Sequence, residues 1–232
     1  KNLGTGHAES RLKERTKSGT GASVAEFFYG AISGWKVYHF HDTSDTAGVK
    51  RLCAVHDNEF LRMDASNLAA FLYRLKSEEP EVYSQIRKTV RLAVPFFDDF
   101  VLKPMTLPSE EQQVRLLWKQ QGSDYSLWPS QLSDGSIRFI CLVTALMQPR
   151  MPPTIIIDEP ELGLHPYAIT LLGALVRSAA KRTQVIISTQ SVPLLNEFEI
   201  DDLIVVEREQ GASVFKRLDD FDFERWLNDY TV

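Results

Sequence analysis

The sequence lacks long apolar runs, has only two cysteines and carries no excess of basic residues. Without a run near about 18 apolar residues, a transmembrane helix is not predicted, and the basic start precedes no apolar signal-peptide segment. Cys53 and Cys141 show no metal-ligand spacing, which favours free thiols in a reducing compartment. A net charge of -5 argues against tight DNA binding by bulk electrostatics. We therefore expect a cytoplasmic protein with no membrane association.

The sequence does contain a segment that predicts a buried strand ending in two acidic residues. At 154–160 it reads Thr-Ile-Ile-Ile-Asp-Glu-Pro, a β-branched run typical of a strand covered on both faces in a parallel sheet. In open α/β sheets the ligand crevice lies at the carboxyl ends of the strands, so Asp158 and Glu159 would stand at its lip. The simpler interpretation is a strand that ends in a solvated acidic turn.

Three further motifs flank this strand in a defined order. Upstream, Leu-Ser-Asp-Gly-Ser at 132–136 precedes a segment, 137–147, that we expect to form an amphipathic helix. Downstream, Glu-Leu-Gly-Leu-His at 161–165 leads into a helix that begins at Pro166, where proline is well tolerated. The segment 184–191 then predicts a second buried strand, followed by small polar residues.

This order of motifs resembles the C-terminal half of an ABC-type ATPase head: signature loop, helix, Walker B strand, D-loop, helix and switch strand. DEPELGLHP at 158–166 and STQS at 188–191 resemble more narrowly the RecF/SMC-like bacterial AAA-family ATPases, which include phage-defence ATPases. The resemblance is strong over 132–208 and weaker over 35–118. It implies an α/β P-loop NTPase fold, with a mostly parallel sheet flanked by helices and a helical signature lobe.

The resemblance also implies ATP and Mg²⁺ as cofactors and assigns the acids at the strand end. Asp158 would hold Mg²⁺, and Glu159 would position or deprotonate the attacking water. Gln190 stands where many ABC ATPases have a switch histidine. A glutamine can hydrogen-bond a γ-phosphate or orient water, but it cannot titrate.

The resemblance implies a homodimer that forms through the signature and D-loop faces. In this dimer the signature loop of one copy would contact the nucleotide bound by the other copy. Ser133 and Gly135 match the family's signature serine and its following glycine, while Asp134 stands where many signatures have glycine. A helix N-terminus at this point would present further donors to an anion. Ser133 also fits a plain N-cap, and His165, in the D-loop, also fits a cap or packing residue.

A P-loop is missing from this order. No G-x-x-x-x-G-K-[ST] occurs in the 232 residues, and the Lys-Ser pair Lys17-Ser18 follows Thr16 rather than a glycine. In the resembled family the P-loop lies in an N-terminal segment that precedes this region. We therefore expect that segment as a partner and expect the chain alone to be inactive.

Three parts are predicted along the chain. They are a flexible lead-in (1–23), a helical lobe with a strand pair (24–130) and an ATPase core (131–232) that ends in a hairpin and a short helix. The expected helices are 67–76, 80–92 and 221–230, and the expected strands outside the core sheet are 100–107, 113–118, 202–208 and 213–218.

The functional hypothesis is an ATP-hydrolysing head that switches its dimer state to act on DNA or on a separate nuclease or toxin. The alternatives are a non-hydrolysing dimerisation or partner-docking module, and a nucleic-acid-binding element. His39, His41 and Asp42 alternate like metal ligands, but a solvated strand face explains them better, with Tyr38 and Phe40 facing the core.

Overall fold

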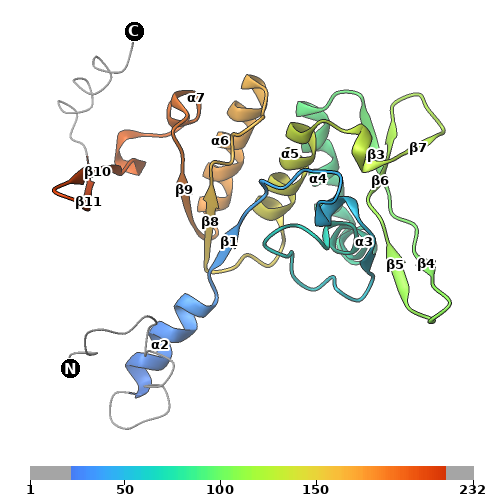
Figure 1. Ribbon diagram of the computed structural model, residues 1–232, viewed down its shortest axis with the longest axis horizontal. Helices are drawn as coiled ribbons and strands as arrows, with labels where there is room; N and C mark the ends of the chain where they lie inside the picture. Colours follow the sequence, from blue (N-terminus) through green and yellow to red (C-terminus); the bar gives the residue numbers. More distant parts are fainter. Residues whose placement is uncertain (1–21, 218–232) are drawn as a thin grey trace.

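The apolar run forms β8 (Thr154–Asp158), the central strand of a three-stranded parallel sheet in the computed structural model. The structure describes residues 22–217. β8 lies between β1 (Lys36–Tyr38) and β9 (Gln184–Ser188), as Figure 1 shows. Since all three strands run parallel, their carboxyl ends meet at one edge of the sheet. This confirms the α/β class with a parallel sheet flanked by helices.

The two faces of this sheet are covered unequally. Ile155 and Ile157 of β8 are buried, whereas Ile156 between them is only half-buried. In β9, exposed and half-buried residues alternate, and Ile186 is 43% exposed. The prediction of a second fully buried strand was therefore wrong. The physical reason is that β9 is an edge strand, paired only with β8 among the described residues.

The helix α5 (Asp134–Met147), which follows the expected signature loop, runs through the middle of the protein (Figure 1). Ten consecutive residues, 137–146, are buried, so the prediction of an amphipathic helix was wrong. A helix surrounded by protein on all sides has no solvent face to show. It contacts both α4 (Pro80–Ala93) and α6 (Pro166–Ala180). One hydrophobic cluster extends from Phe71 and Phe97 through α5 to Ile157.

The helices predicted on either side of α5 are confirmed. α6 begins at its proline and buries Ile169, Leu172 and Val176 at helical spacing. α3 (Leu68–Glu78) and α4 pack together; α4 buries residues at helical spacing, whereas α3 buries the consecutive residues 68–72 as well as Leu75. The helix α2 (Ala22–Ser33) was not predicted. It extends away from the body in Figure 1, directly before β1.

The two long strands predicted before the signature are each broken in two. β3 (Phe97–Val101) and β4 (Met105–Thr106) replace the first, and β5 (Gln112–Val114) and β6 (Leu117–Gln120) replace the second. The halves belong to two antiparallel sheets, β2-β5-β4 and β3-β6-β7. Pro104 lies at the first break, where its missing N–H cannot join a ladder.

The C-terminal hairpin is confirmed as β10 and β11, while the predicted helix 221–230 and most of the lead-in 1–23 lie outside the described residues. No helix in the described part is long and apolar enough to cross a membrane. The remaining elements are β2 (Cys53–Ala54), β7 (Ser126–Leu127), β10 (Val205–Glu209), β11 (Ala212–Lys216), α7 (Val192–Leu195) and three 3-10 turns, Gly48–Lys50, Pro129–Gln131 and Ile200–Asp202.

Burial in the sheet predicts which isoleucines hold the fold together. Replacing Ile157, which is 1% exposed, with Ala removes buried methylene groups and leaves a cavity, so the free energy of unfolding should fall by about 2–5 kcal/mol. Ile186→Ala, at the 43% exposed position of β9, is the matched control and should cost well under half as much. Denaturant unfolding measures both, and equal losses would contradict the unequal covering of the two faces.

Candidate nucleotide site at the sheet edge

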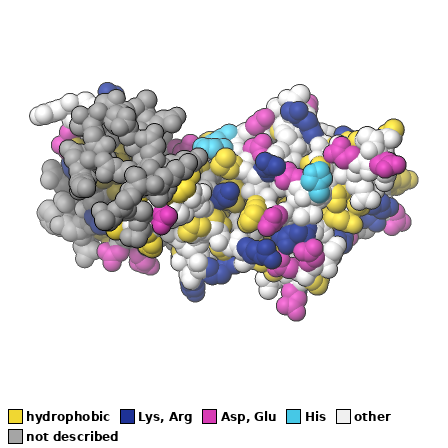
Figure 2. Space-filling model, turned by 90° about the horizontal axis from the view of Figure 1, so that it is seen from below, with side chains coloured by type: hydrophobic (Ala, Val, Ile, Leu, Met, Phe, Trp, Pro, Cys, Tyr) yellow, Lys and Arg dark blue, Asp and Glu magenta, His cyan; other side chains and the backbone are white. Residues whose placement is uncertain are grey.

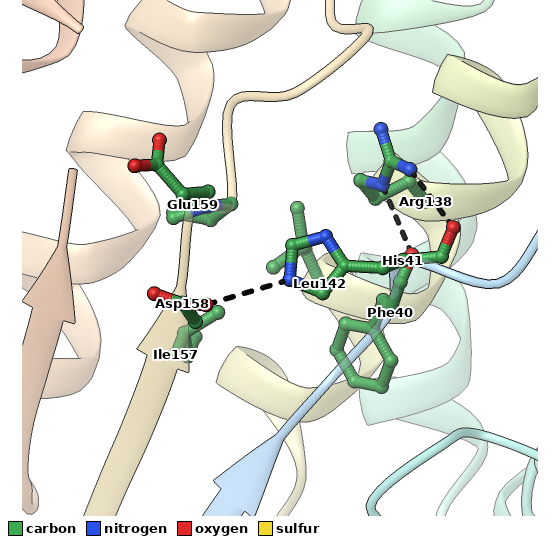
Figure 3. A pocket seen from close by; sticks show the side chains of 8 residues that line it. Phe40, His41, Arg138, Leu142, Ile157, Asp158 and Glu159 are labelled. Atoms are coloured by element: carbon green, nitrogen blue, oxygen red, sulfur yellow. Dashed lines mark hydrogen bonds and ion pairs between the residues drawn. The ribbon is translucent and has the colours of Figure 1, made fainter. Parts of the chain in front are cut away.

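Asp158 is the point where side chains from three segments meet. It ends β8 beside Ser188 of β9, whose hydroxyl donates a hydrogen bond to Asp158 Oδ1. From the segment after β1, His41 directs Nε2 toward the other carboxylate oxygen, Oδ2, at 3.8 Å (Figure 3). A pocket at this edge is lined by Phe40, His41, Arg138, Leu142, Ile157, Asp158, Glu159 and Pro160.

Glu159 turns the chain sharply after the strand. Its φ is 40°, in the left-handed region that costs a residue with a side chain about 1–2 kcal/mol, and its N–H donates to Ser188 O at 2.9 Å. Its carboxylate points away from His41 (Figure 3). Non-glycine residues held in this region cluster at functional sites. The two adjacent acids therefore present their carboxylates in different directions.

Glu161 is a third acid of this segment, and no role was predicted for it from the sequence. It is buried, and its Oε1 accepts a hydrogen bond from Thr189 Oγ1 at 2.5 Å. Its Oε2 has no hydrogen-bond partner among the described residues. Burial, and the neighbouring Glu159 carboxylate, raise the pKa of Glu161. The bond ties the residue that precedes the expected D-loop (162–165) to the segment that carries Gln190. Thr189 Oγ1 also accepts from Ser191 N–H at 3.0 Å.

The expected signature loop (132–136) packs against the expected D-loop (162–165) of the same chain. Ser133 caps α5, because its Oγ accepts from Ser136 N–H at 3.1 Å, and Asp134 lies in the first turn, 4.0 Å from Lys50 Nζ. A Cβ on Gly135 would overlap the carbonyl oxygen of Gly163. This close approach explains a glycine at position 135 without reference to a ligand.

Arg138 holds these segments together, and it too was not predicted from the sequence as a functional residue. Its Nε donates to Phe40 O at 3.0 Å, Nη2 donates to His41 O at 3.3 Å, and Nη1 donates to Leu162 O in the D-loop. Burial lowers the pKa of its guanidinium. The available signal was a single arginine in an otherwise apolar helix, since a buried charge needs partners.

The remaining predicted residues lie around this centre and do not line its pocket. His165 caps α6: its Nδ1 accepts from Tyr167 N–H at 3.3 Å, as expected for a residue before a helix-initiating proline. Gln190 is exposed just after β9. Asp158 and Glu159 are therefore brought together with His41 and Arg138, while Ser133, His165 and Gln190 are placed on neighbouring loops.

The donor set fits a metal that arrives with a nucleotide. Among residues 22–217 no group of three or more His, Cys, Asp or Glu side chains is placed to hold a metal ion. Asp158 and Ser188 do supply a carboxylate and a hydroxyl oxygen at one point. Mg²⁺ commonly uses one or two carboxylates and takes its other ligands from phosphates and water. The residues suit a magnesium–nucleotide complex better than a resident metal.

A known family matches this arrangement. Residues 18–196 match the family model described as "AAA domain, putative AbiEii toxin, Type IV TA system". The chain belongs to this AAA-domain family. Membership makes it an ATPase-type, nucleotide-binding domain. No curated protein matches the chain significantly.

Solved heads of SMC proteins share the fold of this AAA domain. One, from work on ATP-driven dimerization and DNA-stimulated activation of SMC ATPases, is 16% identical with a TM-score of 0.50, covering 68% of this chain and 94% of that one. Another, an SMC head bound to the C-terminal winged-helix domain of ScpA, is 12% identical with a TM-score of 0.56, covering 82% and 57%. This AAA domain thus spans little more than half of the second. Identities this low show the fold alone.

The contact between signature loop and D-loop predicts the effect of adding one methyl group. Gly135→Ala should force the backbones at 135 and 163 apart, because the new Cβ meets a carbonyl oxygen, and should lower the free energy of unfolding by about 1–3 kcal/mol. Gly30→Ala in α2 is the control: a Cβ there meets nothing within 4 Å, and alanine favours helix by about 0.5–1 kcal/mol. Thermal unfolding measures both, and an unaffected Gly135→Ala variant would refute the contact.

Proposed function

We propose that this chain is part of an ABC-type, RecF/SMC-like ATPase head that binds and hydrolyses ATP with Mg²⁺. The observation that carries the proposal is the pair Asp158 and Glu159 at the carboxyl end of the central parallel strand, with the second acid held at a positive φ. A bound Mg²⁺ neutralises phosphate charge during phosphoryl transfer. Asp158, with Ser188 hydrogen-bonded to it, would hold the ion, and Glu159 would orient or deprotonate water.

The proposed signature function belongs to a dimer. Ser133, Asp134 and Gly135, with the N-terminus of α5, would meet the γ-phosphate bound by a second copy, and His165 would lie at the same interface. Ser133 and Asp134 are exposed, which supports their availability. Gln190 would sense the γ-phosphate through its amide. Switching between open and closed dimers would then act on DNA or on an effector such as a separate nuclease or toxin.

Arg138 supports this proposal, because it makes the signature helix and the D-loop one unit. A phosphate bound at the α5 N-terminus would displace α5. Through the hydrogen bonds of Arg138, this movement would also displace Leu162, Phe40 and His41, whose carbonyls accept from it. Glu161 and Thr189 would carry the same displacement to the segment with Gln190. Binding across the dimer would thus reach the metal site of the same chain.

We further propose that the P-loop comes from a segment outside residues 1–232 and completes the core sheet. Among residues 22–217 no strand pairs with the outer edge of β9, and Ile186 on this strand is 43% exposed. Both observations support this, because an unpaired edge strand can accept a further strand. The division into lead-in (1–23), lobe (24–130) and core (131–232) belongs to the proposal. One strand of the core sheet, β1, comes from the predicted lobe range (24–130) and not from the predicted core range (131–232).

The alternatives explain less of the site. A non-hydrolysing docking module has no use for two acids and a strained backbone at a strand end, where burying or crowding charge is costly. For a nucleic-acid-binding element, a basic surface is expected. Over the described part of the face shown in Figure 2, acidic and basic side chains are interspersed.

The test of hydrolysis is Glu159→Gln in the complete protein. The amide keeps the shape of the side chain but cannot accept a proton from water, so ATP turnover should fall by about 100-fold or more while nucleotide binding persists. Glu199→Gln, at an exposed glutamate that does not line the pocket, is the matched control and should keep full turnover. Unchanged hydrolysis by the Glu159 variant would rule out the proposed role.

The origin of the P-loop is tested by calorimetric titration with MgATP. The chain of 232 residues alone should give no detectable binding, because the backbone amides and lysine that cradle phosphates are missing from it. The complete protein should bind. Clear binding by the isolated chain would show that a phosphate cradle lies within it and would contradict this part of the proposal.

A further inference from the structure

Among the histidines of the described residues, His41 alone points toward the proposed metal site. Its Nε2 lies 3.8 Å from Asp158 Oδ2, and Figure 3 shows the ring pointing across the pocket toward that carboxylate. His39, two residues earlier, does not line the pocket, and the centroids of the two rings are 6.4 Å apart. The expectation of a solvated face is confirmed, because His39 and His41 are exposed while Tyr38 and Phe40 are buried. The contact of His41 with Asp158 is an addition to it.

The position of the His41 ring is set by the structure on both sides of it. Its own carbonyl and that of Phe40 accept hydrogen bonds from the buried Arg138. The Phe40 ring is buried and stacks on Tyr38 at 5.4 Å between centroids. The backbone that carries His41 is thus anchored in the core, and the imidazole does not depend on a free loop for its direction.

The distance suits two ligands of one ion. Imidazole nitrogen and carboxylate oxygen bind transition metals at about 2.0–2.2 Å, so two ligands of the same ion lie at most about twice that distance apart. The 3.8 Å separation falls inside this limit but is longer than a hydrogen bond. Imidazole suits transition metals, whereas Mg²⁺ prefers oxygen ligands.

We propose that His41 supplies a nitrogen ligand, opposite Asp158, to a divalent transition-metal ion that enters with the nucleotide. The inference rests on the proposed function, because phosphate and water must complete the coordination. Three segments then contribute to one ion: His41 after β1, Asp158 of β8 and, through its bond to Asp158, Ser188 of β9. The site would then accept Mn²⁺ with the nucleotide as well as the Mg²⁺ of the proposed function.

Pulsed electron paramagnetic resonance of Mn²⁺ bound with ATP tests this directly. The complete protein is labelled with ¹⁵N-histidine, so that any ¹⁵N coupling to Mn²⁺ comes from the protein and none from adenine. Wild type should show the coupling, and His41→Ala and His41→Gln should lose it. Mn²⁺ affinity in both variants should fall by about tenfold or more, with a smaller change for Mg²⁺.

His39→Ala is the matched control and should keep both the coupling and the affinity. Nucleotide-dependent Mn²⁺ binding that needs Asp158 but shows no ¹⁵N coupling would overturn the inference and leave the proposed function standing. Coupling that persists in His41→Ala would also overturn it, because another histidine would be the ligand. If Mn²⁺ and Mg²⁺ both fail to bind with ATP, the proposed function fails as well.

Discussion

The site depends on the hydrogen bonds of one buried guanidinium. Arg138 enters the core on the signature helix and binds carbonyls from the segment after β1 and from the D-loop. Burying a charge is costly unless it is fully partnered, so these three segments must lie together wherever the core is intact. Asp158 and His41 approach each other because the backbones that carry them are fixed around this contact.

The acids at the sheet edge face in two directions. Asp158 faces His41 and accepts from Ser188, Glu159 is turned away by its positive φ, and Glu161 lies buried against Thr189. Glu159 and Glu161 remain neighbours, because burial and the Glu159 carboxylate both raise the pKa of Glu161. Such an edge has a charge distribution ready for a cation.

Short-range sequence patterns predicted the helices and strands more reliably than the burial of their faces. The strand at 154–158 and the helices after it follow from β-branching, spacing and a helix-initiating proline. Pro104 was a local signal for the break between β3 and β4, which the prediction of one strand overlooked. The all-round burial of α5 and the open face of β9 could not be predicted this way. Each depends on which distant segment packs against the element, and hydrophobic periodicity does not identify that packing partner.

The sequence by itself determined the order of motifs, the acids at the strand end and the α/β class, because these follow from residue type and short-range spacing. Tertiary structure alone decided that His41 faces Asp158, that Gly135 lies against Gly163 and that Arg138 joins the two loops. Arg138 and Phe40 are 98 residues apart in the chain. Contacts across such separations are selected by the packing of the whole core, not by any local preference of the residues that make them.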